Sequence, residues 1–104
     1  MICAHTVRRL KSGTFEQFAE GFGPPEGAEA AGWVSFYMLR GIADPNEVVT
    51  FGFFDGTAEQ LEASQAEMGY SEVRGAIEPL VEAVIANGLY EIAKSQATVG
   101  EAAV

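Results

Sequence analysis

Two apolar stretches, WVSFYML at residues 33–39 and VVTFGFF at residues 48–54, decide the fold of this chain. Both are rich in the β-branched and aromatic residues that favour strands. Between them lies Ala43-Asp44-Pro45-Asn46, in which proline holds a turn position that suits its fixed φ. We therefore expect the two stretches to pair as an antiparallel hairpin that ends at Gly56.

The residues before the hairpin predict a strand, a helix and a loop. Ile2 to Leu10 reads as a strand, with alternate side chains on opposite faces. Thr14 and Gln17 have the spacing of a capping box, which predicts a helix with a phenylalanine stripe. Residues 21–32 are rich in glycine and proline and predict an irregular segment, either a functional lid or a plain connector.

The residues after the hairpin predict a helix in two pieces and a final strand. Thr57 and Gln60 have the spacing of a second capping box, which predicts the start of a helix. Gly69 interrupts that helix. Ser71 is expected to cap a further helix that carries apolar residues as far as Ile85, with a kink at Pro79.

Asn87-Gly88 is the expected stop of that helix, and residues 89–94 form the last, shorter strand. The order is then β-α-β-β-α-β, an α+β chain with the ferredoxin-like, split βαβ arrangement. Residues 1–94 make a single domain, and residues 95–104 are expected to be a flexible C-terminal tail.

Both faces of the two central strands are apolar, although helices can cover only one face in this topology. Strict alternation places Trp33 and Tyr37 on one face of the first strand, and Phe36 and Met38 on the other. In the second strand, Phe51 and Phe54 lie on opposite faces, and Phe51 would lie at the subunit interface if its face is the one that the helices leave free. A second copy of the sheet is the simplest cover, so we expect a homodimer through the sheet face.

Composition narrows the classes of partner. The chain has 104 residues and a formal net charge of −9, which disfavours nucleic acids and membrane surfaces as partners. No apolar run is long enough to span a bilayer, and the N-terminus lacks the layout of a secretory signal. One cysteine permits no intrachain disulfide, so we expect a cytoplasmic setting. With one histidine, we expect no bound metal.

The order of elements resembles the dimeric α+β barrel superfamily, and within it the antibiotic biosynthesis monooxygenase-like domains. The resemblance lies in the opening strand and Phe-rich helix, the hairpin with Asp44-Pro45-Asn46, Phe54-Asp55-Gly56 before a helix, and Glu78-Pro79-Leu80 before the last strand. It covers residues 1–94. It implies two sheets that form a barrel, with a substrate cleft between each sheet and its helices.

Enzymes of that group include cofactor-free oxygenases of polycyclic aromatic compounds and haem-degrading oxygenases. Active members often carry histidine, sometimes with tryptophan, on the helix after the third strand, but residues 59–68 contain neither. The asparagine that haem-degrading members place on the first strand is not obvious either. Haem degradation is therefore disfavoured, and we expect no cofactor.

Five residues are candidates for a site. His5, the only imidazole, is a candidate general base, and Tyr37 a candidate catalytic residue. Trp33, Tyr37 and Tyr90 could stack on an aromatic ligand, and Arg40 could hold an anionic group. Each has a structural alternative: a hydrogen-bonded histidine, aromatic core packing, or an arginine paired with a carboxylate.

Two functions follow from these expectations. The first is a cofactor-independent monooxygenase that acts on a small aromatic or polyketide-like molecule, in which His5 helps to deprotonate the substrate. The second is a non-catalytic dimeric binding or stress-associated module of the same fold. An open cleft containing His5 or Tyr37 would favour the enzyme, and a cleft filled by Phe and Met side chains would favour the module.

Overall fold

The computed structural model describes residues 1–24 and 31–96, in which four antiparallel strands form one sheet in the order β2-β3-β1-β4. The strands are β1 (Ile2–Leu10), β2 (Trp33–Arg40), β3 (Glu47–Phe54) and β4 (Val81–Glu91). The helices are α1 (Phe15–Gly21), α2 (Ala58–Glu67) and α3 (Tyr70–Ile77), followed by a short 3-10 helix at Glu78–Leu80. This is the expected α+β, ferredoxin-like arrangement.

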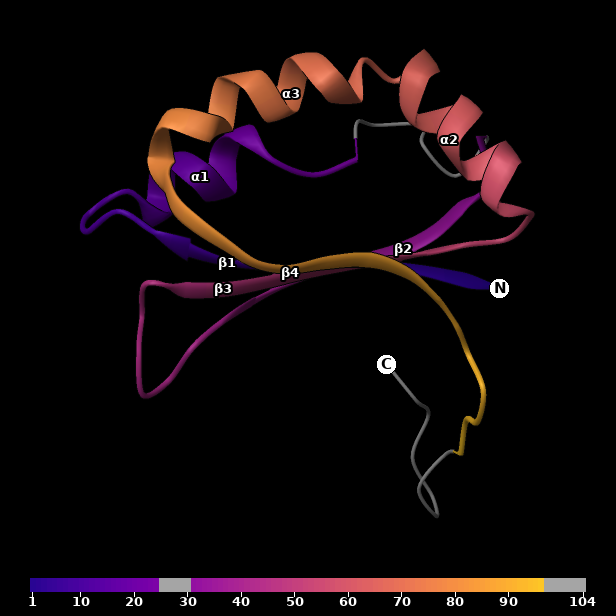
Figure 1. The fold of residues 1–104 in the computed structure, drawn as a ribbon, viewed down its shortest axis with the longest axis horizontal. Coiled ribbons are helices and arrows are strands. Elements are labelled where there is room, and N and C mark those ends of the chain that lie inside the picture. The colour runs from indigo at the N-terminus through magenta and orange to yellow at the C-terminus, as the bar shows by residue number, and fades with distance from the viewer. Residues whose placement is uncertain (25–30, 97–104) are drawn as a thin grey trace.

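All three α-helices lie on one face of the sheet, which we call the covered face (Figure 1). Among residues 1–24 and 31–96, no helix lies on the other face, which we call the open face (Figure 1). Burial along β3 alternates strictly, because Val48, Thr50 and Phe54 point toward the helices while Phe51 does not. The prediction that the helices cover only one side of the sheet is confirmed.

The core under the helices has two parts. One cluster joins Leu10 and Val48 of the sheet to Phe18 of α1 and Ile77 of α3. The other joins Trp33, Phe54 and Leu61 of α2. These seven side chains are the buried apolar core of the described residues, and the division leaves room between the two clusters for a cavity.

One of the two predicted capping boxes forms. Thr57 Oγ1 accepts the Gln60 backbone N–H at 3.1 Å, and the Gln60 side chain accepts the Thr57 N–H at 2.9 Å. The box expected at Thr14 is wrong. The Thr14 hydroxyl instead donates to the backbone oxygens of Lys11 and Leu80, so it ties the start of α1 to the 3-10 helix.

A β-bulge at Val34 corrects the predicted faces of β2. Trp33 pairs with Phe54 while Ser35 pairs with Phe53, so one extra residue interrupts the alternation. As a result Trp33 shares the covered face with Phe36 and Met38. Tyr37, which was predicted to lie on the same face as Trp33, lies on the open face instead. Strict alternation had grouped Trp33 with Tyr37.

The last part of the chain corrects the predicted helix and strand. The helix ends at Ile77, because Pro79 cannot donate to the next turn, and β4 begins at Val81. Val84, Ile85 and Asn87 therefore belong to a strand, and Asn87-Gly88 is no helix stop. Gly69, at φ +68°, is the N-cap of α3 in place of Ser71.

Two expected segments fall partly outside the described residues: the middle of the loop at 21–32 (residues 25–30) and most of the tail at 95–104 (residues 97–104). Within residues 1–24 and 31–96, no helix has both the length and the apolar character needed to cross a membrane.

Candidate functional site

A cavity of about 260 Å³ lies between the covered face of the sheet and α2 and α3. Its apolar walls come from Phe22 after α1, Trp33 and Phe36 of β2, Met68 after α2, and Leu89 of β4. Ligand sites in proteins are typically concave, mostly apolar and equipped with a few polar groups. The cavity meets that description, with a volume near the lower end of the usual range.

Trp33 is the best anchored wall of the cavity and is only 8% exposed. Its Nε1–H donates to the Ser64 hydroxyl of α2 at 3.2 Å, and its ring meets Phe54 edge to face at 5.2 Å between centroids. A Cβ added at Gly52 would lie 3.0 Å from the indole, so the glycine lets the ring lie directly on β3. The indole is thus a rigid apolar surface with its own polar atom already bonded.

Few polar groups face the cavity. Thr6 Oγ1 donates to Asn87 Oδ1 at 3.0 Å, which joins β1 and β4 across the floor. Thr50 lines the floor as well, and α3 contributes Tyr70 and Arg74. Glu62 and Gln65 of α2 complete the polar lining.

Arg8 lies behind this lining and is 5% exposed. Its Nη1 donates to Thr50 Oγ1 at 3.0 Å, and its guanidinium carbon lies 4.7 Å from the centre of the Phe22 ring. Burial lowers the pKa of Arg8, although the nearby Tyr70 hydroxyl favours the charged form. An arginine stays protonated even so, and a full positive charge therefore lies next to the cavity.

Three of the predicted site residues form an aromatic row on the open face. The Tyr37 and Phe51 rings are stacked at 5.1 Å, Phe51 and His5 at 6.4 Å, and Tyr90 meets His5 edge to face at 5.7 Å. The Tyr90 ring lies over Gly88, whose added Cβ would be 3.3 Å from the hydroxyl. The structure brings these residues together, but on the face opposite the cavity.

The environment of His5 is apolar. Its Nδ1 is buried and has no hydrogen-bond partner in the described part of the chain. Cys3 lies on the same face, and burial raises the pKa of its thiol, which disfavours the thiolate needed for a Cys–His pair. The catalytic roles expected for His5 and Tyr37 stay predictions, because neither side chain lines the cavity between sheet and helices.

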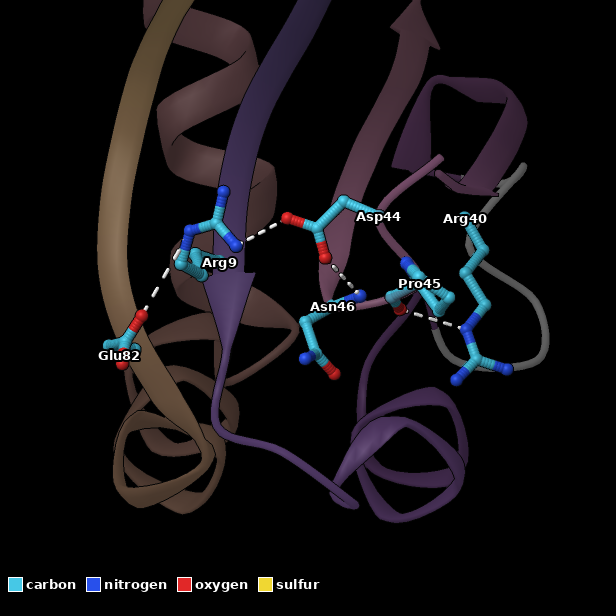
Figure 2. A network of polar contacts seen from close by, with 6 residues as sticks. All are labelled: Arg9, Arg40, Asp44, Pro45, Asn46 and Glu82. Carbon is cyan, nitrogen blue, oxygen red and sulfur yellow. Dashed lines mark hydrogen bonds and ion pairs between the residues drawn. The ribbon is translucent and has the colours of Figure 1, made fainter. Parts of the chain in front are cut away.

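Arg40, the predicted anion-binding residue, lies at the hairpin end of β2, away from the cavity. Its Nε donates to the Pro45 carbonyl at 2.9 Å (Figure 2). Its guanidinium carbon lies 4.1 Å from the centre of the Phe15 ring. The same end of the sheet holds an ion pair between Arg9 and Asp44, which keeps the pKa of the Asp44 carboxyl below its usual value (Figure 2). Of the five predicted residues, Trp33 alone is at the cavity.

The sequence interpretation missed Arg8, Tyr70, Arg74 and Asn87. Arg8 carried a signal, because alternation along β1 puts it on the same face as Thr6, where a charge is unusual. Asn87 was missed because it was predicted to end a helix, whereas it lies in β4. For Tyr70 and Arg74 no local signal existed, since their position depends on how α3 packs.

Similar folds occur in several solved structures. A candidate antibiotic biosynthesis monooxygenase from Chloroflexus aurantiacus is 14% identical, with a TM-score of 0.75 over 92% of this chain and 96% of the other. SnoaB from Streptomyces nogalater, described as a cofactor-independent oxygenase, is 17% identical, with a TM-score of 0.66 over 96% and 97%. A candidate monooxygenase from Nitrosomonas europaea is 18% identical, with a TM-score of 0.69 over 88% and 97%.

The chain therefore has the fold of the antibiotic biosynthesis monooxygenase-like proteins, as the resemblance implied. No known family profile matches the sequence. No curated protein matches it either.

Proposed function

We propose that this protein binds a small aromatic or polyketide-like molecule in the cavity beside Trp33 and oxygenates it without a cofactor. The observation that supports this most is the cavity itself, which is mostly apolar, is open to a ligand and lies between the sheet and the helices. The similarity in fold to SnoaB, described as a cofactor-independent oxygenase, points to the same class of reaction.

The cavity suits a flat, apolar ligand. Trp33, Phe22 and Phe36 offer aromatic surface on which a ring can stack, and Met68 can adapt to its outline. Gln65 and Asn87 can hydrogen-bond to oxygen substituents and so fix the orientation of the ring. The helices cover this face of the sheet (Figure 1), so a ligand that fills the cavity would displace water from the reacting ring and so protect a reactive oxygen intermediate.

The chemistry needs only the substrate and O₂. An electron-rich phenol, once deprotonated, can donate an electron to O₂, and the new carbon–oxygen bond forms on the ring. Loss of water then leaves a quinone, so one oxygen atom enters the product and the other leaves as water. The protein binds the ring, excludes bulk water and stabilises the deprotonated form.

We further propose that two copies associate through the open face. The aromatic row of Tyr37, Phe51, His5 and Tyr90 lies there, where no element of the described part of the chain covers it, and Tyr90 and Leu39 are 52% and 48% exposed. Contiguous apolar patches of this kind usually mark interaction sites. A second copy of the sheet supplies a patch of the same chemistry.

A second candidate is a non-catalytic binding module. It is favoured by one observation, since neither His5 nor Tyr37 lines the cavity and no other histidine exists in the sequence. A module whose cleft is filled by its own Phe and Met side chains is disfavoured, because the cavity is open. The two candidates thus share a ligand site and differ in whether oxygen is consumed.

Titration with phenols of one to four fused rings tests both candidates. We expect binding to change the fluorescence of Trp33, the only tryptophan, and turnover to consume O₂ and to incorporate one ¹⁸O atom from ¹⁸O₂ into the product. Binding without O₂ uptake would support the module. Absence of binding across the series would contradict both.

A cavity-filling variant locates the site. Val73→Phe adds a ring at the α3 wall, and we expect it to weaken binding about tenfold or more while the protein stays folded. Ile42→Phe is the matched control, because Ile42 is fully exposed in the hairpin loop. Equal binding by Val73→Phe and the parent would place the ligand elsewhere.

A further inference from the structure

Arg8 is a buried cation without a visible counter-charge. In residues 1–24 and 31–96, both ion pairs belong to Arg9, and no carboxylate lies within 4 Å of the Arg8 guanidinium. Its contacts are the Thr50 hydroxyl at 3.0 Å and the faces of Phe22 and Phe18, at 4.7 Å and 5.7 Å. These neutral groups solvate the charge only in part.

An unpaired buried charge is costly, and proteins usually pair it or neutralise it. Arginine does not take the second route, since its guanidinium keeps its proton. Burial lowers the pKa of Arg8, and the neighbouring Arg74 lowers it further. A second cation close by increases the need for a negative charge between them.

The position of Arg8 connects it to the ligand cavity. Phe22 and Thr50, which contact its guanidinium, both line that cavity, as does Tyr70, whose hydroxyl is close enough to favour the charged form of Arg8. Arg74 lines the cavity as well, and with Arg8 it also lines an adjoining hollow of about 330 Å³ next to β4. Arg74 therefore lies at the cavity, and Arg8 lies behind its lining and at the hollow that Arg74 shares with it.

The acidic residues nearby do not fill this role. Glu62 lines the cavity from α2 and is exposed. Glu78 and Glu82 line the adjoining hollow and are also exposed, and the Glu82 carboxylate lies 3.9 Å from Arg9 instead.

We infer that the ligand of the cavity is an aromatic acid, whose carboxylate extends past Arg74 into the adjoining hollow and pairs there with Arg8. A guanidinium has five N–H donors, so Arg8, which lies over Phe22 and donates through Nη1 to Thr50, keeps further donors for the oxygens of a carboxylate. The aromatic part of the ligand then lies along Trp33. This inference rests on the proposed function, because it assumes an aromatic ligand in the same cavity.

Calorimetry with 2-naphthoate and its neutral analogue 2-naphthamide tests the inference. We expect the parent to bind the acid at least about tenfold more tightly than the amide, as for a charge-assisted, partly desolvated pair. In Arg8→Gln the preference should fall to about one, with the affinity for the amide within about twofold of the parent. Arg9→Gln, on the same strand but the opposite face, should keep the parental preference.

A stability measurement separates this role from a purely structural one. If Arg8 awaits an anionic ligand, Arg8→Met should raise the melting temperature of the free protein, and 2-naphthoate should stabilise the parent but not the variant. A lower melting temperature together with an unchanged acid preference would show a structural role. If Arg8→Gln does not fold, Arg74→Gln at an exposed position should lower the acid preference about threefold or more.

The results distinguish the two proposals. If the parent binds neither 2-naphthoate nor 2-naphthamide, the proposed function is contradicted. Equal binding of acid and amide by the parent, or the same preference in the parent, Arg8→Gln and Arg74→Gln, would overturn the inference and leave the aromatic site intact.

Discussion

Trp33 shows how a single side chain is fixed by its own hydrogen bond while one face of its ring still lines the cavity. Ser64 accepts its N–H, Phe54 meets its edge, and Gly52 leaves space for its face. A ring held in this way loses little conformational freedom when a ligand stacks on it. The specificity for polar substituents must then come from other residues, above all from Asn87 and Arg8.

His5→Ala tests where the chemistry takes place. Because His5 lies on the open face, we expect turnover of the phenol substrate to stay within a few-fold of the parent. Initial rates of O₂ uptake measure this, with Val73→Phe as the variant that should lose activity. A loss of about 100-fold would support His5 as a general base and would move the reaction to the open face.

At the scale of elements, the hairpin could be predicted and the last strand could not. β2 and β3 combine dense β-branched and aromatic residues with a proline turn, so local preferences and tertiary structure agree. In β4, irregular pairing with β1 puts Val81 opposite Leu10 and Val84 opposite Arg8, so both face the helices. Their spacing of three residues imitates a helix, and only the sheet around them resolves the ambiguity.

The cavity was less predictable than the fold for the same reason. The interruption at Val34 moved Trp33 to the covered face, and the true boundary of α3 brought Tyr70 and Arg74 over the floor. Periodicity alone contains neither effect, because both depend on where a strand breaks its alternation or a helix stops.

Two glycines give opposite expectations for alanine. Gly32 has φ +105°, and an added Cβ would lie 2.7 Å from the Phe54 ring, so Gly32→Ala should lower the free energy of unfolding by about 2–4 kcal/mol. Gly75 lies inside α3 with nothing within 4 Å of an added Cβ, so Gly75→Ala should raise it by about 0.5–1 kcal/mol.

Urea unfolding of both variants measures these changes. A stabilising Gly32→Ala would contradict the backbone geometry before β2, and a destabilising Gly75→Ala would contradict the open space beside α3.

At the scale of the whole molecule, the asymmetry between the two faces of the sheet is the dominant feature (Figure 1). The formal charge of −9 repels other copies at long range, so an association through the open face has to come from short-range apolar contact. The same field disfavours an approaching anion, which makes the local positive charge of Arg8 and Arg74 more important for an acidic ligand.

Phe51→Asp tests the proposed dimer. The substitution puts a charge in the middle of the aromatic row, so we expect a monomer or a precipitate in place of a dimer. Light scattering coupled to size exclusion measures the mass, and Ile42→Asp, in the exposed loop, should leave it unchanged. A parent that is already monomeric, or a dimer that persists in Phe51→Asp, would contradict the proposed interface.

The extra residue at Val34 has a consequence for how this site can change over generations. Trp33 faces the helices because an odd insertion separates it from the regular part of β2. Losing that residue would restore uniform alternation with Trp33 still opposite Phe54, so the indole would keep facing the helices; pairing Val34 itself with Phe54, with no residue lost, would turn the indole outward onto the surface where copies would meet. In such a chain the loss of one residue at Val34 leaves both faces of the sheet as they are, whereas a shift of the strand's register by one residue moves the indole from one face to the other.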